Sequence, residues 1–401
     1  MVQAEVNIGV VGHVDHGKTT LTKALTGKWA DEHSEEQKRG ITIKLGYADV
    51  DFKKCKSCGK FFSGEQCPCL STEGVVVRRV SFLDAPGHET LMATVIAASS
   101  IMDGALFVVA ANEECPQPQT QEHLVVLEAS GIKNIVVAQN KVDLVEKAQV
   151  KKHHQQLRDF LKDTRFADAP IIPTAANSGV SLSALIQAIQ EHIPTPKRNR
   201  NAAPRLMIAR SFDINKPGKA LDRITGGVVG GSIVTGEFRK GDEVRISPGA
   251  RREQKGRESY IPLTTKIKAL HAGDSTLEEA GPGGLVAIAT DLDPTFTKAD
   301  SLTGCVVTRA DEELPVMDEL IARIKPFPRV LEPFAETFVE NEPLVLGVGT
   351  ATTVGFVVKQ KKGKVKLKLK KPVVLTGNDV IAVMRRAGNR WRLYASAELV
   401  E

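Results

Sequence analysis

The stretch GVVGHVDHGKTTL, residues 9–21, constrains this chain more than any other. Gly12, Gly17, Lys18 and Thr19 fit the pattern G-x-x-x-x-G-K-S/T, which describes a phosphate-binding loop. The apolar run VNIGVV before it predicts a buried strand, and KTTLTKAL after it predicts the start of a helix. A glycine-rich turn between the two aims backbone N–H groups at phosphate oxygens, helped by the positive end of the helix dipole. The chain is therefore expected to bind a nucleotide.

The pattern of elements predicts the fold class. Apolar runs such as GALFVVAA and NIVVAQNKVD alternate with helical stretches such as TQEHLVVLEASG. This alternation is typical of an α/β domain with a mixed, mostly parallel sheet, which binds its ligands at the carboxyl ends of the strands. The run IPTPKRNRNAAP then predicts a linker, and the short strands with Gly, Pro and Asp turns beyond it predict two all-β barrels.

We expect three domains in the 401 residues: a nucleotide-binding domain at 1–200 with a cysteine-rich insertion at 54–74, and barrels at 201–313 and 314–401. The 42% hydrophobic and 25% charged residues indicate a globular protein rather than a membrane protein. No apolar run reaches the roughly 18 residues of a membrane span, and the first predicted strand leaves no room for a signal peptide. A cytoplasmic protein without membrane contact is expected. The net charge of +6 permits nucleic-acid binding without requiring it.

A second phosphate-site element is DAPGH, residues 84–88, which closes the apolar strand VSFL. The carboxylate of Asp84 can hold Mg²⁺ through water, and the N–H of Gly87 can meet a terminal phosphate. Between the two phosphate elements lies RGITIKLG, residues 39–46, after a charged stretch. Thr42 could ligate Mg²⁺ only while the terminal phosphate is present, which suits a switch. The alternative is an exposed loop leading into the next strand.

The motif NKVD, residues 140–143, closes another apolar strand. Asp143 can accept hydrogen bonds from the N1–H and the exocyclic amino group of guanine. Adenine offers no such pair, so a buried carboxylate would be left unsatisfied at a cost of about 1–3 kcal/mol or more. On its own NKVD would suit a surface turn, but in this order and spacing it indicates guanine.

Together, GHVDHGKTTL, RGITIKLGY, DAPGHETLM and QNKVD resemble the motifs of a translational GTPase. The longer resemblance is to the gamma subunit of archaeal and eukaryotic translation initiation factor 2. It rests on the KLGYAD strand, the cysteine insertion, AANEECPQPQTQEHL, SFDINKPG, GGVVGGSI and NRWRLYA. The resemblance implies a GTPase, slow without stimulation, that uses GTP and GDP with Mg²⁺. It also implies that the chain carries methionylated initiator tRNA to the small ribosomal subunit, in a complex with alpha and beta subunits.

The same resemblance assigns roles to individual residues. Lys18 would contact the β- and γ-phosphates, while Thr19 and Thr42 would ligate the main magnesium. A possible second magnesium would lie at Asp15 and the backbone of Gly40. His88 would position the attacking water; the alternative is that it caps the following helix. The residues expected around the nucleotide are Asp15, His16, Gly17, Lys18, Thr19, Thr20, Gly87, Asn140, Lys141, Asp143, Ala175, Ala176 and Asn177.

The guanine loop departs from the family pattern. Its usual Ser-Ala-Leu is replaced here by PTAANSG, with Ala175 and Ala176 at the Ser and Ala positions. The N–H of Ala176 could still meet the guanine oxygen. Loss of the serine hydroxyl removes a bracing hydrogen bond worth roughly 0.5–1.5 kcal/mol, so affinity is expected to fall somewhat while specificity survives.

Four cysteines cluster in CKSCGKFFSGEQCPC. Two C-x₂-C turns are a strong zinc signal, but the second half here is C-x-C, which is tighter and less typical. We expect structural zinc on Cys55, Cys58, Cys67 and Cys69. The alternative is a reduced, metal-free loop, and a disulfide is least expected in the cytosol. Cys115 and Cys305 are isolated and are expected to be packing residues.

The run KQKKGKVKLKLKKP holds eight lysines at residues 359–371. Its alternation predicts a strand with one apolar and one basic face. We favour an edge strand protected against aggregation by lysines over a patch that contacts the phosphates of tRNA or ribosomal RNA. The run itself has no aromatic residue for base stacking.

Three other functions fit part of the sequence. They are an elongation factor that delivers a special aminoacyl-tRNA, a metabolic GTPase subunit of the sulfate-activation type, and a scaffold subunit with a decayed GTPase centre. The cysteine insertion and SFDINKPG argue against the first two. The intact motif residues argue against decay.

Overall fold

The computed structural model describes residues 3–29, 45–88, 91–215, 218, 224–254, 256–329, 334–335, 337–376 and 379–400. The chain forms two compact units, of which the first includes Gln3–Pro196 and the second begins at Lys197. Within the described ranges, no helix is both long enough and apolar enough to cross a membrane.

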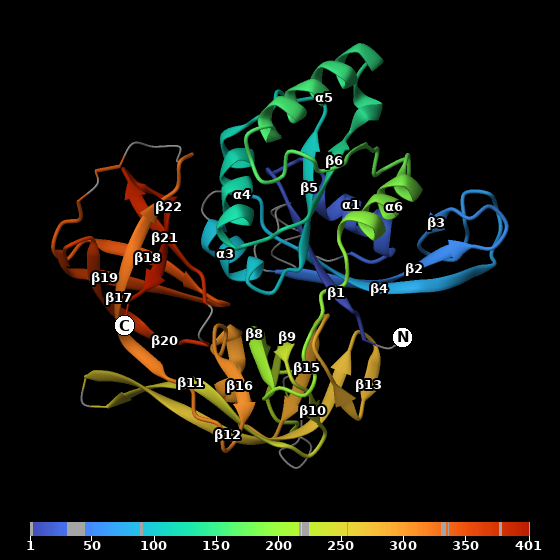
Figure 1. Ribbon diagram of the computed structural model, residues 1–401. Coiled ribbons are helices and arrows are strands. Elements are labelled where there is room, and N and C mark those ends of the chain that lie inside the picture. The colour runs from blue at the N-terminus through green and yellow to red at the C-terminus, as the bar shows by residue number, and fades with distance from the viewer. Residues whose placement is uncertain are drawn as a thin grey trace. The chain divides into compact units, whose positions relative to one another are not determined.

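The first unit is built on a seven-stranded sheet in the order β3-β2-β4-β1-β5-β6-β7 (Figure 1). Strands β4, β1, β5, β6 and β7 run parallel, and β2 pairs antiparallel with β4 and β3. The strands are β1 (Val6–Val11), β2 (Gly46–Cys55), β3 (Phe61–Phe62), β4 (Gly74–Asp84), β5 (Gly104–Ala110), β6 (Ile135–Asn140) and β7 (Ile171–Pro173). The helices are α1 (Lys18–Thr26), α3 (Met92–Ser99), α4 (Pro118–Ala129), α5 (Lys147–Leu161) and α6 (Leu182–His192), with a 3₁₀ turn η2 (Val142–Leu144). The predicted α/β domain with a mixed, mostly parallel sheet is confirmed.

The central strands are apolar on both faces because helices cover both sides of the sheet. On one face, alternate residues of β1 share a core with Leu21 and Leu25 of α1 and with Leu185 and Ile189 of α6. On the other face, the side-chain amide of Gln139 in β6 donates to a backbone carbonyl of α5. This two-sided burial fixes the parallel strands, so that their carboxyl ends, which carry the motifs, meet at one edge.

The second unit contains two all-β barrels, as predicted. In the first barrel the strands pair in the ring β11-β16-β8-β9-β15-β12-β11, and β13 adds to β12. The strands are β8 (Arg205–Phe212), β9 (Val228–Thr235), β10 (Phe238–Arg239), β11 (Glu243–Gln254), β12 (Arg257–Ala272), β13 (Ser275–Leu277), β14 (Glu279–Ala280), β15 (Val286–Thr290) and β16 (Val306–Arg309). Two 3₁₀ turns, η4 (Pro294–Phe296) and η5 (Lys298–Asp300), lie between β15 and β16.

The second barrel closes in the order β17-β20-β19-β18-β21-β22. Its strands are β17 (Val316–Pro326), β18 (Pro343–Val348), β19 (Ala351–Lys361), β20 (Lys364–Val374), β21 (Ile381–Ala387) and β22 (Arg390–Leu399). The core side of β20 is formed by Val365, Leu367 and Leu369, which alternate with lysines as the sequence predicted.

The prediction that the lysine run is an edge strand is wrong. The run spans the end of β19, a turn and most of β20, and β20 pairs with β17 on one side and β19 on the other. Barrel closure removes the edge, because every strand then has two neighbours.

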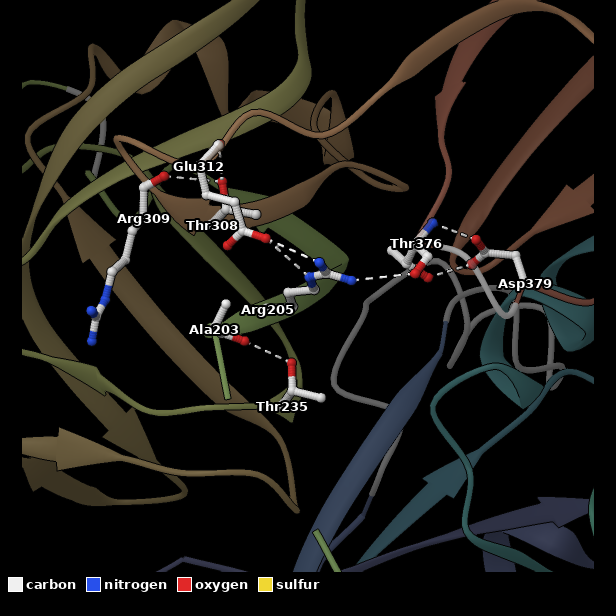
Figure 2. A network of polar contacts seen from close by, with 8 residues as sticks. All are labelled: Ala203, Arg205, Thr235, Thr308, Arg309, Glu312, Thr376 and Asp379. Atoms are coloured by element: carbon white, nitrogen blue, oxygen red, sulfur yellow. Dashed lines mark hydrogen bonds and ion pairs between the residues drawn. The ribbon is translucent and has the colours of Figure 1, made fainter. Parts of the chain in front are cut away.

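The two barrels are joined by a network of polar contacts (Figure 2). The guanidinium of Arg205 at the start of β8 donates to Glu312 Oε1 at 3.0 and 3.3 Å, and to the carbonyl of Thr376 at 3.3 Å. Thr376 is held in turn by Asp379, which accepts from its hydroxyl at 2.8 Å. One arginine therefore links the first barrel, the connection to β17 and the loop after β20.

Candidate active site and metal centre

The phosphate-binding loop connects β1 to α1, and its two glycines hold conformations that a side chain would prevent. Gly12 has φ +147° and Gly17 has φ +86°. A Cβ on Gly12 would lie 2.2 Å from the carbonyl oxygen of Val108 in β5, and one on Gly17 would lie 2.5 Å from Nδ2 of Asn140. The backbone of the loop therefore passes directly against β5 and the NKVD motif, which explains the spacing of the glycines.

Lys18 is the first residue of α1, and its side chain turns back over the loop. Its Nζ donates to the carbonyl of His13 at 2.8 Å. The backbone of Gly87 lies against the same ammonium, because a Cβ on Gly87 would be 2.4 Å from Lys18 Nζ and 2.9 Å from the nitrogen of Val14. The structure thus brings the DAPGH motif to the phosphate-binding loop, with the lysine between them.

Thr19 and Asp84 meet on the other side of the loop. The Thr19 hydroxyl donates to Asp84 Oδ2 at 2.6 Å. A hydroxyl oxygen and a carboxylate oxygen in contact form the kind of hard oxygen donor set that Mg²⁺ prefers. Gly40 and Thr42, the other predicted magnesium ligands, lie outside the described residues.

Asn140 joins three motifs at the end of β6. Its Nδ2 donates to the carbonyl of His16 at 2.9 Å, and its Oδ1 accepts from the N–H of Ala176 at 3.2 Å and from the hydroxyl of Thr174 at 3.4 Å. Lys141 follows with φ +61° in the left-handed region, and Asp143 lies exposed in η2. The phosphate-binding loop, NKVD and the loop after β7 therefore form one site.

The loop after β7 is braced without the serine of the family pattern. Ala175 and Val180 form an antiparallel bridge, in which Val180 N–H donates to Ala175 at 3.1 Å. Asn177 lies exposed inside this bridge. The N–H of Ala176, predicted to meet the guanine oxygen, donates to Asn140 in this structure. The lost hydroxyl is thus replaced by backbone contacts and by Thr174.

His88 is half-buried next to Gly87. Its carbonyl accepts from the N–H of Leu91 at 2.9 Å, and α3 begins at Met92 with Leu91 at its N-cap position. His88 therefore lies on the turn that connects the phosphate site to α3. The remaining predicted residues, Asp15 with φ +61° and Thr20 in the first turn of α1, lie on the same loop and helix.

The four clustered cysteines come together at the far end of the β2–β4 hairpin. Cys55 Sγ lies 3.6 Å from Cys69 Sγ, Cys58 Sγ lies 3.5 Å from Cys67 Sγ, and all four sulfurs lie within 4.8 Å of one another. Sulfurs around tetrahedral zinc would be about 3.8 Å apart, given Zn–S distances of about 2.3 Å. A backbone N–H of Cys58 lowers the pKa of Cys55 to about 6, whereas burial and the neighbouring thiols raise the pKa of Cys67 to about 12, so the spacing of the sulfurs carries the metal assignment. The cluster fits a structural zinc site despite its C-x-C half.

Comparisons with known proteins agree with this geometry. The family model for the Elongation factor Tu GTP binding domain matches residues 3–195, that for Elongation factor Tu domain 2 matches 226–308, and that for Initiation factor eIF2 gamma, C terminal, matches 312–399. Translation initiation factor 2 subunit gamma of Pyrococcus horikoshii is 50% identical over 98% of this chain and 96% of its own length. The same subunit of Methanococcus vannielii is 49% identical over 98% of this chain and 97% of its own length.

This chain belongs to the gamma-subunit family of translation initiation factor 2. Among solved structures it is similar to a bacterial selenocysteine-specific elongation factor, with a TM-score of 0.75 and 25% identity. All of this chain is covered, but only 58% of that one. The elongation factor SelB of Methanococcus maripaludis, with a TM-score of 0.71 and 23% identity, shows the same fold.

As a member of the gamma-subunit family, the chain is a translation-initiation GTPase that uses GTP and GDP with Mg²⁺. The close approach of the Gly87 backbone to Lys18 fits a phosphate group, and the adjacent oxygens of Thr19 and Asp84 fit Mg²⁺. When bound, Mg²⁺ supplies positive charge to the phosphate oxygens. Cys115 and Cys305 are buried free cysteines, as expected of packing residues.

Two histidines beside the site are buried: His16, which was expected near the nucleotide, and His123, which carried no motif signal. His16 lies with Nδ1 3.1 Å from the carbonyl of Val108 and Nε2 3.3 Å from Glu113 Oε2, and burial lowers its pKa to about 4. Burial, together with the charge of Lys18, lowers the pKa of His123 in α4 to about 3. Both rings are neutral at physiological pH. Only the position of His16 inside the loop could have indicated this environment from sequence.

Proposed function

We propose that this chain carries methionylated initiator tRNA to the small ribosomal subunit, as the gamma subunit of a complex with alpha and beta subunits. GTP hydrolysis triggers release. The observation that carries the proposal is the identity of about half of all residues with gamma subunits over 98% of the chain. The similarity includes both barrels and is not confined to the GTPase domain, and the C-terminal family model is specific to the gamma subunit.

The roles of the site residues are part of this proposal. Lys18 binds the β- and γ-phosphates, and Thr19 and Asp84 hold the magnesium together with Thr42. Asp15 and the backbone of Gly40 hold a second magnesium. Support comes from the contacts of Lys18 with the loop and of Thr19 with Asp84.

Guanine is read by Asp143, with Asn140 holding the loops on either side of the base. The support is that Asn140 donates to the carbonyl of His16 and accepts from the Thr174 hydroxyl and the Ala176 N–H. Recognition by a carboxylate rejects adenine, because the carboxylate would then lose its hydrogen-bond donors. Lys141, Ala175, Ala176 and Asn177 line the same pocket.

Hydrolysis is attack of water on the γ-phosphorus of GTP, which breaks the bond to the β–γ bridging oxygen and releases GDP and inorganic phosphate. Lys18 and the N–H of Gly87 stabilise the charge on the phosphate oxygens, and His88, the next residue along the chain, orients the water. Support comes from the close approach of Gly87 to Lys18 Nζ. Without a partner that completes this arrangement, hydrolysis is expected to be slow.

We also propose the three-domain division at residues 200 and 313, and a cytoplasmic location.

The second candidate function is delivery of a special aminoacyl-tRNA by an elongation factor. It is favoured by the similarity to a bacterial selenocysteine-specific elongation factor.

A pull-down of the tagged chain from its native cells separates the two functions. The proposal predicts that initiator tRNA and two further subunits co-purify. Recovery of an elongator tRNA without those subunits would favour the elongation factor instead.

A further inference from the structure

The hairpin formed by β19 and β20 ends in four exposed lysines, Lys359, Lys361, Lys362 and Lys364, here called the tip lysines. The pairing of β18 with β19 reaches only Phe356, and that of β17 with β20 reaches only Val365. The tip therefore extends beyond the two strands that flank the hairpin in the barrel. It contributes little to the barrel core, so its composition is free to serve another purpose.

The charge of the tip is not neutralised within the described part of the chain. Residues 343–378 contain eight lysines and neither an acidic residue nor an arginine. Two lysines nearer the barrel are paired with β17: Lys366 lies 2.8 Å from Glu319, and Lys368 lies 2.7 Å from Asp318. Among the described residues, no acidic group lies within ion-pair distance of a tip lysine. The hairpin thus has two neutralised lysines beside β17 and a cationic tip.

Folding alone does not explain lysine at these positions. Lys361 and Lys364 lie directly opposite each other across the hairpin, and like charges at such a pair destabilise it. Lys362 has φ +50° and precedes Gly363 with φ +72°. A two-residue turn of this conformation favours Asn or Gly at the first position. The sequence therefore keeps a cationic tip against local preferences.

Protection of an edge is a weaker explanation than binding. β20 is not an edge strand, and the exposed sides of the tip are only a few residues long. One or two charged side chains are enough to protect such a short edge, whereas the tip has four lysines. A cluster of positive charges without neighbouring acidic residues is instead typical of a surface that binds an anionic polymer.

We propose that the tip lysines bind the phosphate backbone of double-helical RNA. The tip itself has no aromatic side chain, so stacking on unpaired bases is not supported. An A-form helix is recognised mainly through its backbone and shape, which suits a narrow cationic hairpin. The choice of RNA rests on the proposed function in translation initiation; the cationic tip itself does not.

The test compares two double variants that remove the same charge from the same hairpin. K361Q/K364Q removes two tip lysines, and the matched control K366Q/K368Q removes the two lysines paired with Glu319 and Asp318. Binding of the full-length chain to a labelled RNA duplex of about 20 base pairs is measured by fluorescence anisotropy between about 50 and 200 mM KCl. Neither nucleotide nor initiator tRNA is present, so a failure here is separate from a failure of the proposed function.

K361Q/K364Q is expected to weaken binding about 10-fold or more at about 100 mM KCl. The slope of log K against log salt should fall in magnitude by about 1.8, which is 0.9 for each lost phosphate contact. The control should stay within about two-fold of the wild type, with an unchanged slope. Equal losses in both variants, or no loss in either, would overturn the proposal.

K361E/K364E keeps the tip charged and distinguishes RNA binding from protection of an edge. It should abolish duplex binding while leaving the melting temperature and solubility of the chain unchanged. Aggregation of K361Q/K364Q with undiminished RNA binding would show that the lysines protect an edge. Displacement of the duplex by polyglutamate at equal charge concentration would point to an acidic protein partner and would also overturn the proposal.

Discussion

At the scale of single residues, His88 tests the assignment of catalysis. His88→Ala should lower single-turnover GTP hydrolysis by about 10²–10⁴, the range for losing a group that orients or activates a reactant. Affinity for GTP and GDP should stay within a few fold, because Lys18 and the phosphate-binding loop are unchanged. The matched control is His192→Ala, which alters an exposed histidine at the end of α6. Unchanged hydrolysis in His88→Ala would reduce the residue to a structural role in the turn before α3.

The buried histidines His16 and His123 predict how stability depends on pH. Their folded pKa values, about 4 and about 3, lie below the ordinary 6.5, so the unfolded chain binds protons first as the pH falls. Stability is therefore complete above about pH 6.5 and is lost below it, toward pH 4. From pH 7.5 to 5.5 each histidine should cost about 1.3 kcal/mol of unfolding free energy.

Urea unfolding of Trp391→Phe checks this, because it leaves Trp29 as the single tryptophan, in the nucleotide-binding unit. The control is the same chain with His123→Asn, which should lose the share of that residue; the rest comes from His16 and from His153 and His154, whose pKa values burial also lowers. A free energy of unfolding equal at pH 7.5 and pH 5.5 would contradict the neutral, buried state of both rings.

At the scale of elements, the cysteine hairpin carries the metal prediction. Protein purified without chelator should contain about one zinc per chain. Cys67→Ser with Cys69→Ser should remove the zinc, because the C-x-C half supplies two of the four sulfurs, and nucleotide binding should remain largely intact. Cys115→Ala, outside the cluster, should keep the metal. Zinc retained in the double variant, or absent from the wild type in elemental analysis, would refute the site.

Arg205 is one of the polar links between the barrels, beside Lys371, whose Nζ donates to the carbonyl of Thr303 at 2.9 Å. Arg205→Ala should destabilise the two-barrel unit by about 1–3 kcal/mol, because Glu312, 22% exposed, is left without its charged partner (Figure 2). The control is Arg239→Ala, which removes the ion pair of Arg239 with Glu237. Because the Arg239 side chain is 62% exposed, the free energy of unfolding should fall by only about 0–1 kcal/mol. Unfolding followed at Trp391, in β22, makes the comparison. Equal effects of the two substitutions would show that the junction depends on apolar packing alone.

The contacts at these two scales show what a sequence can predict. The strand-end motifs were predictable because each is contiguous and needs particular residue types to meet a phosphate or a base. The contacts of Arg205 with Glu312 and of Lys368 with Asp318 were not, because they depend on which distant strands pair. The edge-strand prediction failed for the same reason, since barrel closure is a property of six strands together.

At the scale of the whole molecule, the central claim is that a guanine-nucleotide site controls binding of initiator tRNA. The site couples to tRNA only if the GTP and GDP states differ in free energy of tRNA binding. Belonging to the gamma-subunit family supports this coupling, and the convergence of Asn140, Lys18 and Gly87 on one loop supplies a site that can sense the terminal phosphate.

The most direct measurement is the affinity of the wild-type chain for methionylated initiator tRNA with a non-hydrolysable GTP analogue and with GDP, at one salt concentration. The account predicts binding at least about 10-fold tighter with the analogue, equivalent to about 1.4 kcal/mol of coupling. Methionylated elongator tRNA, as the control, should bind more weakly in both states. Equal affinity for initiator tRNA with the analogue and with GDP would contradict the account.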